Sequence, residues 1–386
     1  SVQAVRHMLD TALKSDIPQE KKEAVLCHSI IIILEINPRV AVTVLEESAQ
    51  LLGFGLTNAI FSKLIYKHLS DKKDPEAVRA IWNYVKETNF KMDPLSLDSA
   101  LFIATISGMQ DMCQDIWDYY FSGKLDGSIK SILDPAKFFS KLMQYAAMIG
   151  DLQKADIVLQ HTVELGIPPK GSLYCYWLQC HMHSNNISKL KSNPLDIVQF
   201  AVNHHQVNQR APIESISFFN YALVIAVESE SLETFFYVFN LMENANIQRR
   251  SGFAWYKTSE AMCRRLILGC MKFYDPSNVT GREETLWMRI FQYLANLLSE
   301  TVESPLLRER EVPGVGTRIH SDVRAMYVEA LLLSLRFFKR HHFDSLHEQV
   351  RKTYIQTEQV MGTVDKELSY FAEQLGFQPR DFYFNS

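Results

Sequence analysis

The sequence predicts an all-α fold, an α-solenoid of tandem helix–turn–helix repeats in 35-residue units, followed by a C-terminal helical cap. Three observations predict it. Apolar residues recur at helical spacing along most of the chain. Glycine and proline are sparse, at 15 and 13 of 386 residues, and fall between the apolar segments. The stretch 134–169 holds two amphipathic helical patterns joined at Gly150 and closed by Gly166 and Pro169, and this layout returns at a fixed spacing.

The first 23 residues are predicted to form an N-terminal helical cap, and the repeat array is predicted to cover residues 24–255. The clearest unit, 136–170, has Gly150 as its fifteenth residue, between its two helices. A small residue is needed where two antiparallel helices pack tightly, which explains Gly150 and the matching Gly108. The same register, with two short insertions, gives the other units as 24–58, 59–93, 94–128, 171–205 and 216–250.

Beyond residue 256 the 35-residue spacing ends, and the apolar pattern predicts longer helices. The stretch 303–320 is polar, contains proline and glycine, and is predicted to be a loop. Solenoids need an atypical terminal unit with a polar outer face. The region 256–386 is therefore predicted to be a cap or a set of extra repeats, with helices at 259–273, 284–301, 322–340, 346–362 and, shorter, near 366–375.

Composition excludes several classes of protein. Hydrophobic residues make up 47% and charged residues 22%, which is typical of a globular chain. The net charge of −4 argues against a uniformly basic nucleic-acid binder, although it permits a local basic surface. The six scattered cysteines predict buried thiols in a reducing compartment rather than a disulfide framework. The longest apolar run, 29–35, is too short to span a bilayer, so no membrane span is expected.

Motifs that carry chemistry are missing from the sequence. It contains no phosphate-binding glycine-rich loop, no HExxH and no GxSxG, so neither a cofactor nor a catalytic site is expected. Acidic residues of the C-terminal region are scattered and do not suggest a metal-dependent nuclease. Soft ligands cluster only at 175–183, where the i,i+5 spacing of the cysteines suits one helix face poorly. Core thiols are the preferred interpretation, and no metal is expected at Cys175, Cys180, His181 and His183.

A unit of 35 residues that ends in Gly-Ile-x-Pro-x resembles the pentatricopeptide repeat family. Gly150-Asp151-Leu152, Ala155 and the ending Gly166-Ile167-Pro168-Pro169 carry the resemblance. Phe219-Asn220 with Ser231-Leu232-Glu233 and Met242 is a second, fair match. The resemblance covers residues 24–250 and implies binding of single-stranded RNA, about one base per repeat.

The family presents a base-facing pair from the fifth and the last residue of each unit. By register, the resemblance places these pairs at His28 and Asn58, Lys63 and Asp93, Asp98 and Ser128, Ser140 and Lys170, Cys175 and His205, and Asn220 and Arg250. The family's usual pairs combine Thr, Ser or Asn with Asn or Asp, and none of the six matches cleanly. The aliphatic second residue that sandwiches a base is present at Val25, Ile60 and Leu95 but is replaced at Lys137 and Ser172.

These departures favour affinity without base identity. Lysine and arginine at the register positions would hold phosphates rather than read bases. Arg249-Arg250 and Arg264-Arg265 are the stronger candidates for this role. The strip 336–342 mixes cations with aromatic rings, as a nucleic-acid site does, but a helix C-terminus carrying cations is the preferred interpretation. Core packing is likewise preferred over base stacking for Trp82, Trp117, Phe138, Phe139, Phe218, Phe219 and Phe239.

Two functions follow from these observations. The resemblance implies a non-catalytic RNA-binding protein of the mitochondrial matrix that acts in transcript stability, processing or translation. Its partners would be single-stranded RNA and other proteins of an RNA-processing or translation assembly. The alternative is a protein-binding scaffold of the same shape. The 35-residue phase favours the first function, whereas the net acidity and the missing base code favour the second.

Overall fold

The computed structural model describes residues 2–37, 91–123, 127–183, 193–210, 215–245, 253–279, 281–302 and 317–361, with isolated positions at 40–47, 79–87, 125 and 213. Every regular element in these ranges is helical, which confirms the all-α class. The chain folds as two compact units, residues 1–184 and 185–386, and each is described by itself. None of the described helices is long and apolar enough to cross a membrane.

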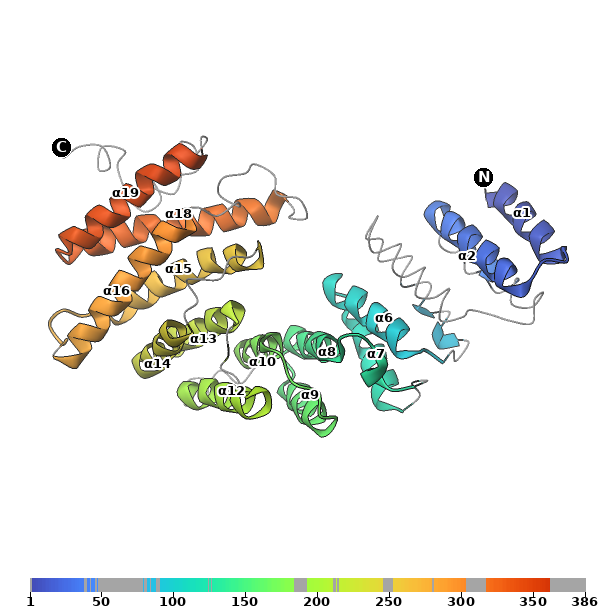
Figure 1. Cartoon of the computed structure of the whole chain (residues 1–386), viewed down its shortest axis with the longest axis horizontal. Coiled ribbons are helices and arrows are strands. Elements are labelled where there is room, and N and C mark those ends of the chain that lie inside the picture. The colour runs from blue at the N-terminus through green and yellow to red at the C-terminus, as the bar shows by residue number, and fades with distance from the viewer. Residues whose placement is uncertain are drawn as a thin grey trace. The chain divides into compact units, whose positions relative to one another are not determined.

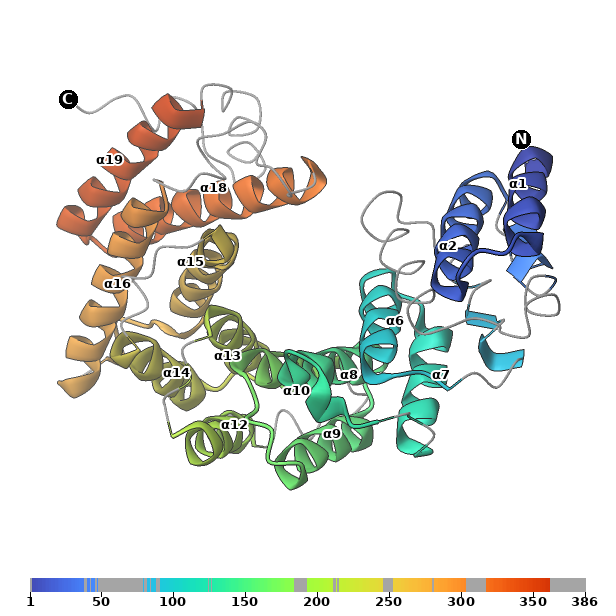
Figure 2. The same cartoon turned by 45° about the vertical axis from the view of Figure 1, so that its right-hand side comes forward.

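The helices of the first unit pack as antiparallel pairs. Helix α1 packs on α2, α6 on α7, and α8 on α9, while α8 also lies against both α6 and α10 (Figures 1 and 2). The predicted boundary between residues 23 and 24 falls within α2. The elements are α1 (Val2–Lys14), α2 (Gln19–Ile36), α6 (Pro94–Ile106), α7 (Gln110–Phe121), the short 3₁₀ turn η1 (Ile129–Ser131), α8 (Pro135–Ile149), α9 (Leu152–Glu164) and α10 (Gly171–His183).

Side-chain caps and proline fix where these helices begin. Asp93 and Asp134 each precede a proline at the first helical position and accept a hydrogen bond from a backbone N–H of the first turn. Proline fits there because its missing N–H would have no intrahelical partner. Asp151 caps α9 in the same way, by accepting from the N–H of Lys154. A cap of this kind pairs a backbone N–H of the first turn and stabilises its helix by about 1 kcal/mol.

The same turn joins the two helices of three predicted units. The fifteenth residue of the unit has positive φ in each case, at Gly108 (67°), Gly150 (66°) and Glu230 (59°). The N–H of the next residue bonds to the carbonyl five positions earlier, at 2.9, 3.0 and 3.0 Å. This is the Schellman arrangement that closes helix C-termini. Two helices joined by this turn are thus present at 94–121, 135–164 and 216–244.

We expect Glu230→Gly to stabilise the second unit by about 0.5–1 kcal/mol, because only glycine adopts positive φ without a steric cost. Glu230 also forms an exposed ion pair with Lys272 at 3.2 Å, whose contribution should be small. Glu230→Ala removes the same ion pair but keeps the Cβ atom. Urea unfolding of both variants separates the two effects, and a Glu230→Gly variant no more stable than Glu230→Ala would contradict the assignment.

The second unit continues the pattern of paired helices, with longer members toward the C-terminus. Helix α13 packs on α14, α15 on α16 and α18 on α19, while α15 lies between α13 and α18 (Figure 1). Its helices are α12 (Pro194–Gln209), α13 (Ile216–Glu228), α14 (Leu232–Asn244), α15 (Phe253–Phe273), α16 (Arg282–Thr301), α18 (Thr317–Arg340) and α19 (Asp344–Met361).

The predicted loop at 303–320 is wrong at its C-terminal end. The stretch 303–320 was expected to be a loop throughout, but α18 already begins at Thr317. Residues 317–320 include neither proline nor glycine, so nothing in them prevents a helix. Residues 303–316 and the helix predicted near 366–375 lie outside the described residues.

The core lies where the helical pattern places it. The seven aromatic residues assigned to packing rather than base stacking are all buried, with 0–7% of their surface exposed. The six cysteines are free thiols and buried, as predicted. Burial raises the pKa of Cys180 to about 12, with Asp151 and Asp156 adding to the shift. Such thiols stay protonated and behave as small apolar side chains.

Candidate functional site

Two ion pairs connect successive helix pairs, and each pair includes one residue that the repeat register predicts to contact a ligand. Both pairs join first helices of neighbouring units, α6 with α8 and the start of α8 with the start of α10. The register residues Asp98 and Lys170 contribute one partner each. The other partners, Lys141 and Asp134, were not among the predicted site residues.

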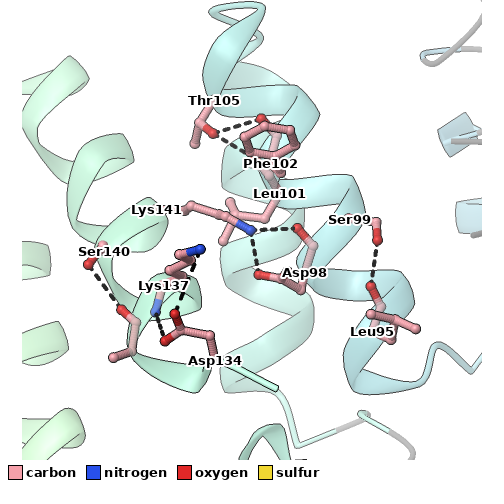
Figure 3. A network of polar contacts seen from close by, with 11 residues as sticks. Leu95, Asp98, Ser99, Leu101, Phe102, Thr105, Asp134, Lys137, Ser140 and Lys141 are labelled. Carbon is pink, nitrogen blue, oxygen red and sulfur yellow. Dashed lines mark hydrogen bonds and ion pairs between the residues drawn. The ribbon is translucent and has the colours of Figure 1, made fainter. Parts of the chain in front are cut away.

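Asp98 and Lys141 form the more buried of the two pairs (Figure 3). The Lys141 ammonium on α8 donates to Asp98 Oδ1 at 2.6 Å and lies 3.4 Å from the Asp98 carbonyl oxygen on α6. It also lies 5.0 Å from the centroid of the Phe102 ring, within the range of a cation–π contact. Only 16% and 19% of the Lys141 and Asp98 side chains are exposed. The Asp98 carboxylate is therefore engaged between two helices.

Lys170 and Asp134 form the second pair, near the helix N-termini. Lys170, immediately before α10, donates to Asp134 Oδ2 at 2.6 Å, and the ammonium of Lys137 lies 3.8 Å from the same oxygen. Burial works to raise the pKa of Asp134, but the hydrogen bond and charge of Lys170, and then those of Lys137, lower it below its usual value. About half of the Lys170 side chain remains exposed, so the ammonium is paired yet accessible to solvent.

Four register residues are buried, which differs from the ligand-facing position expected of them. Ser140 on α8 lies 3.0 Å from the hydroxyl of Ser172 on α10, and Cys175 donates to the Gly171 carbonyl oxygen within α10. His205 on α12 and Asn220 on α13 are 7% and 9% exposed. For Ser140 and Cys175 the reason is the close packing of α8 on α10, which places the fifth residues inside the interface between first helices.

The remaining register residues divide into two groups. Asp93 is the cap of α6, Ser128 is exposed and caps η1, and His28 is exposed on α2 with Nδ1 2.7 Å from the Ala24 carbonyl oxygen. Three lie outside the described residues, namely Asn58, Lys63 and Arg250.

The other basic candidates have different environments. Arg264 forms a bidentate contact with Glu329 on α18. Burial lowers the pKa of Arg265, and the neighbouring charge of Arg264 adds to that shift. In contrast, Lys339 and Arg340, at the end of α18, are exposed.

The cysteine and histidine cluster of α10 is engaged in helix packing. Cys180 Sγ contacts the Ala146 carbonyl oxygen of α8 at 3.6 Å, and His183 Nδ1 lies 3.2 Å from the Ala147 carbonyl oxygen. The His181 ring packs edge-on against Trp177 at 4.3 Å. Within the described ranges, no group of three or more His, Cys, Asp or Glu side chains is arranged to hold a metal ion.

Sequence signals existed for the two partners that were missed. Asp134 directly precedes Pro135, the usual place of a helix cap. Lys141 directly follows Ser140, the fifth residue of its unit, and therefore lies next to a predicted ligand-contacting position. Neither signal indicates which residue of the preceding unit lies opposite.

Comparison with models of known protein families gave no match, and comparison with curated proteins gave none either. Function is therefore inferred from the residues of the chain itself.

Proposed function

We propose that this chain is a pentatricopeptide-like α-solenoid that binds single-stranded RNA without catalysis. It would act by occupancy in mitochondrial transcript stability, processing or translation, shielding a transcript from nucleases or presenting it to a protein partner. The matrix location follows from the resemblance to pentatricopeptide repeats. The observation that supports the proposal best is the identical turn at the fifteenth residue of three units, because repeated hairpins of equal register are the building plan of α-solenoids.

The environment of the register residues favours a phosphate-binding mode over a base-reading mode. Ser140, Cys175, His205 and Asn220 are buried, so their side chains are not available to base edges. Lys170 is accessible and stands at the N-terminal end of α10, where backbone N–H groups and the helix dipole also favour an anion. Contacts of this kind give affinity with little sequence information.

We expect binding of a labelled single-stranded RNA to weaken by roughly 10-fold or more between 50 and 200 mM salt, because phosphate contacts release counterions. Fluorescence anisotropy with the full chain measures this. Lys170→Glu should weaken binding, whereas Asp134→Asn should strengthen it, because it frees the Lys170 ammonium while an asparagine still caps α8. Equal affinity of both variants and the wild type would contradict a role for Lys170.

A protein-binding scaffold remains the second candidate, and one observation favours it. Helix α6 presents Leu95, Phe102 and Ile106 at helical spacing, each with 41–49% of its surface exposed. An exposed apolar stripe of this kind is typical of surfaces that bind a partner helix. Absence of RNA binding even at 50 mM salt would favour this function.

A further inference from the structure

We propose that the turn between α18 and α19 is a phosphate-binding corner that holds the backbone of single-stranded RNA through Lys339 and Arg340. This inference rests on the RNA binding proposed above and adds a contact outside the register positions. The corner consists of the end of α18 and the first turns of α19, residues 336–352, which lie side by side in the second unit (Figure 1).

The charge of this segment is opposite to that of the whole chain. Residues 336–352 carry five lysine and arginine residues against two carboxylates, in a chain whose net charge is −4. One of the two carboxylates, Glu348, is already held by Arg351 at 2.7 and 3.0 Å. The cations at 336, 339 and 340 fall on one face of α18, because residues three and four apart are neighbours on a helix. A local excess of positive charge is what a polyanion requires.

Lys339 and Arg340 differ from the lysines that bridge the helix pairs of the first unit. Lys141 and Lys170 are engaged by aspartates. Both Lys339 and Arg340 are exposed, and no hydrogen bond or ion pair joins their side chains to any residue that the structure describes. Within the described part of the chain, no carboxylate competes with a ligand for these two charges.

Hydrogen bonding to the last carbonyl groups of α18 does not require these cations. The end of the helix is closed by its own backbone, because the N–H of His342 bonds to the Lys339 carbonyl oxygen and the N–H of Phe343 to that of Phe338. His342 adopts a positive φ of 59° to allow this closure. With those two carbonyls satisfied, the side chains of Lys339 and Arg340 are not needed to bond them.

The pKa values of the two histidines beside the corner are lowered mainly by burial, with nearby cations as the next cause. Burial lowers the pKa of His341, and the charges of Arg340 and His342 lower it further. Burial also lowers the pKa of His347, and Lys339 on the facing helix is the next cause. The His341 ring packs against Phe337 at 4.7 Å and against Tyr274 at 5.1 Å. The end of α18 that carries the two cations is therefore well packed, which lowers the entropy lost on binding.

The test is anisotropy of a labelled oligouridine with the full chain and the double variant Lys339→Glu/Arg340→Glu. We expect the double variant to lose roughly 10-fold in affinity at 50 mM salt. We also expect a shallower slope of log affinity against log salt concentration, by the amount that about two phosphate contacts contribute. The matched control is Lys21→Glu/Lys22→Glu on α2, which changes the net charge equally in the other unit. It should change affinity less than about 3-fold, and thermal unfolding should confirm that both variants fold.

Each other outcome has a definite meaning. An unchanged affinity in the Lys339→Glu/Arg340→Glu variant, while the wild type binds RNA, overturns the corner but leaves the proposed function standing. An equal loss in the control variant also overturns the corner, because net charge alone would explain both. Competition by polyglutamate as strong as that by RNA would assign the corner to an acidic protein instead. A wild-type chain that binds no RNA overturns the proposed function itself, together with this inference.

Discussion

Trp287→Ala should destabilise the second unit by about 3–5 kcal/mol, the usual cost of truncating a buried aromatic residue to alanine. Trp287 on α16 is 2% exposed. Its ring lies 5.1 Å from Phe236 on α14, 5.4 Å from Tyr274 after α15, and 5.7 Å from Phe291 on its own helix. A single side chain thus joins three segments, and its removal leaves a cavity among rings that cannot collapse onto one another.

Amide hydrogen exchange, followed by peptide, is the appropriate measurement because the chain folds as two units. Exchange should accelerate in α14, α15 and α16 and stay unchanged in α8 and α9. Met288→Ala is the matched control, because Met288 is the next residue on α16 and its side chain is 42% exposed. This substitution should change the free energy of unfolding by no more than about 0.5 kcal/mol. Equal exchange in the Trp287→Ala variant and the wild type would show that this cluster is not the core of the unit.

Gly269→Ala should also destabilise the second unit, by roughly 1–3 kcal/mol, although alanine normally stabilises a helix interior by about 1 kcal/mol relative to glycine. A Cβ atom at position 269 of α15 would overlap the ring edge of Phe235 on α14. Phe235 is fully buried and is held by the rings of Phe273 and Trp287 at 5.5 and 6.0 Å. It therefore cannot turn away from the added methyl group.

A double variant identifies the cause. Phe235→Leu removes the ring edge that the new methyl group would strike, so Gly269→Ala should cost less in that background than in the wild type. Urea unfolding, followed by hydrogen exchange of the α14, α15 and α16 peptides, gives the interaction energy of this double-mutant cycle. We expect it to reach about 1 kcal/mol, because the two residues are in direct contact. A Gly269→Ala variant that is more stable than the wild type would contradict the close approach of α14 and α15.

Local sequence signals predicted the helices and their turns well. The inter-helix turns at Gly108 and Gly150 lie where the 35-residue register placed them. Periodicity also separated core aromatics from exposed positions, as Phe138 and Phe139 illustrate. These features depend on residues close together in the chain, whose geometry is set by short-range sterics and hydrogen bonding.

The environment of the candidate site was less predictable, because it depends on how one helix lies against the next. Lys141 meets Asp98 from 43 positions away, and Lys170 meets Asp134 from 36. Ser140 is buried because α8 packs closely on α10. A helical pattern shows which residues share a face, but the offset and spacing between two packed helices decide which of those residues remain in contact with solvent.

The turns at Gly108, Gly150 and Glu230 are closed by main-chain groups, and the last of them does so without glycine. A turn that is closed by backbone hydrogen bonds depends little on the identity of the side chains around it. Substitutions can therefore accumulate along such hairpins while each one keeps its bend, and the shape of a unit outlasts the motif by which its sequence would be recognised.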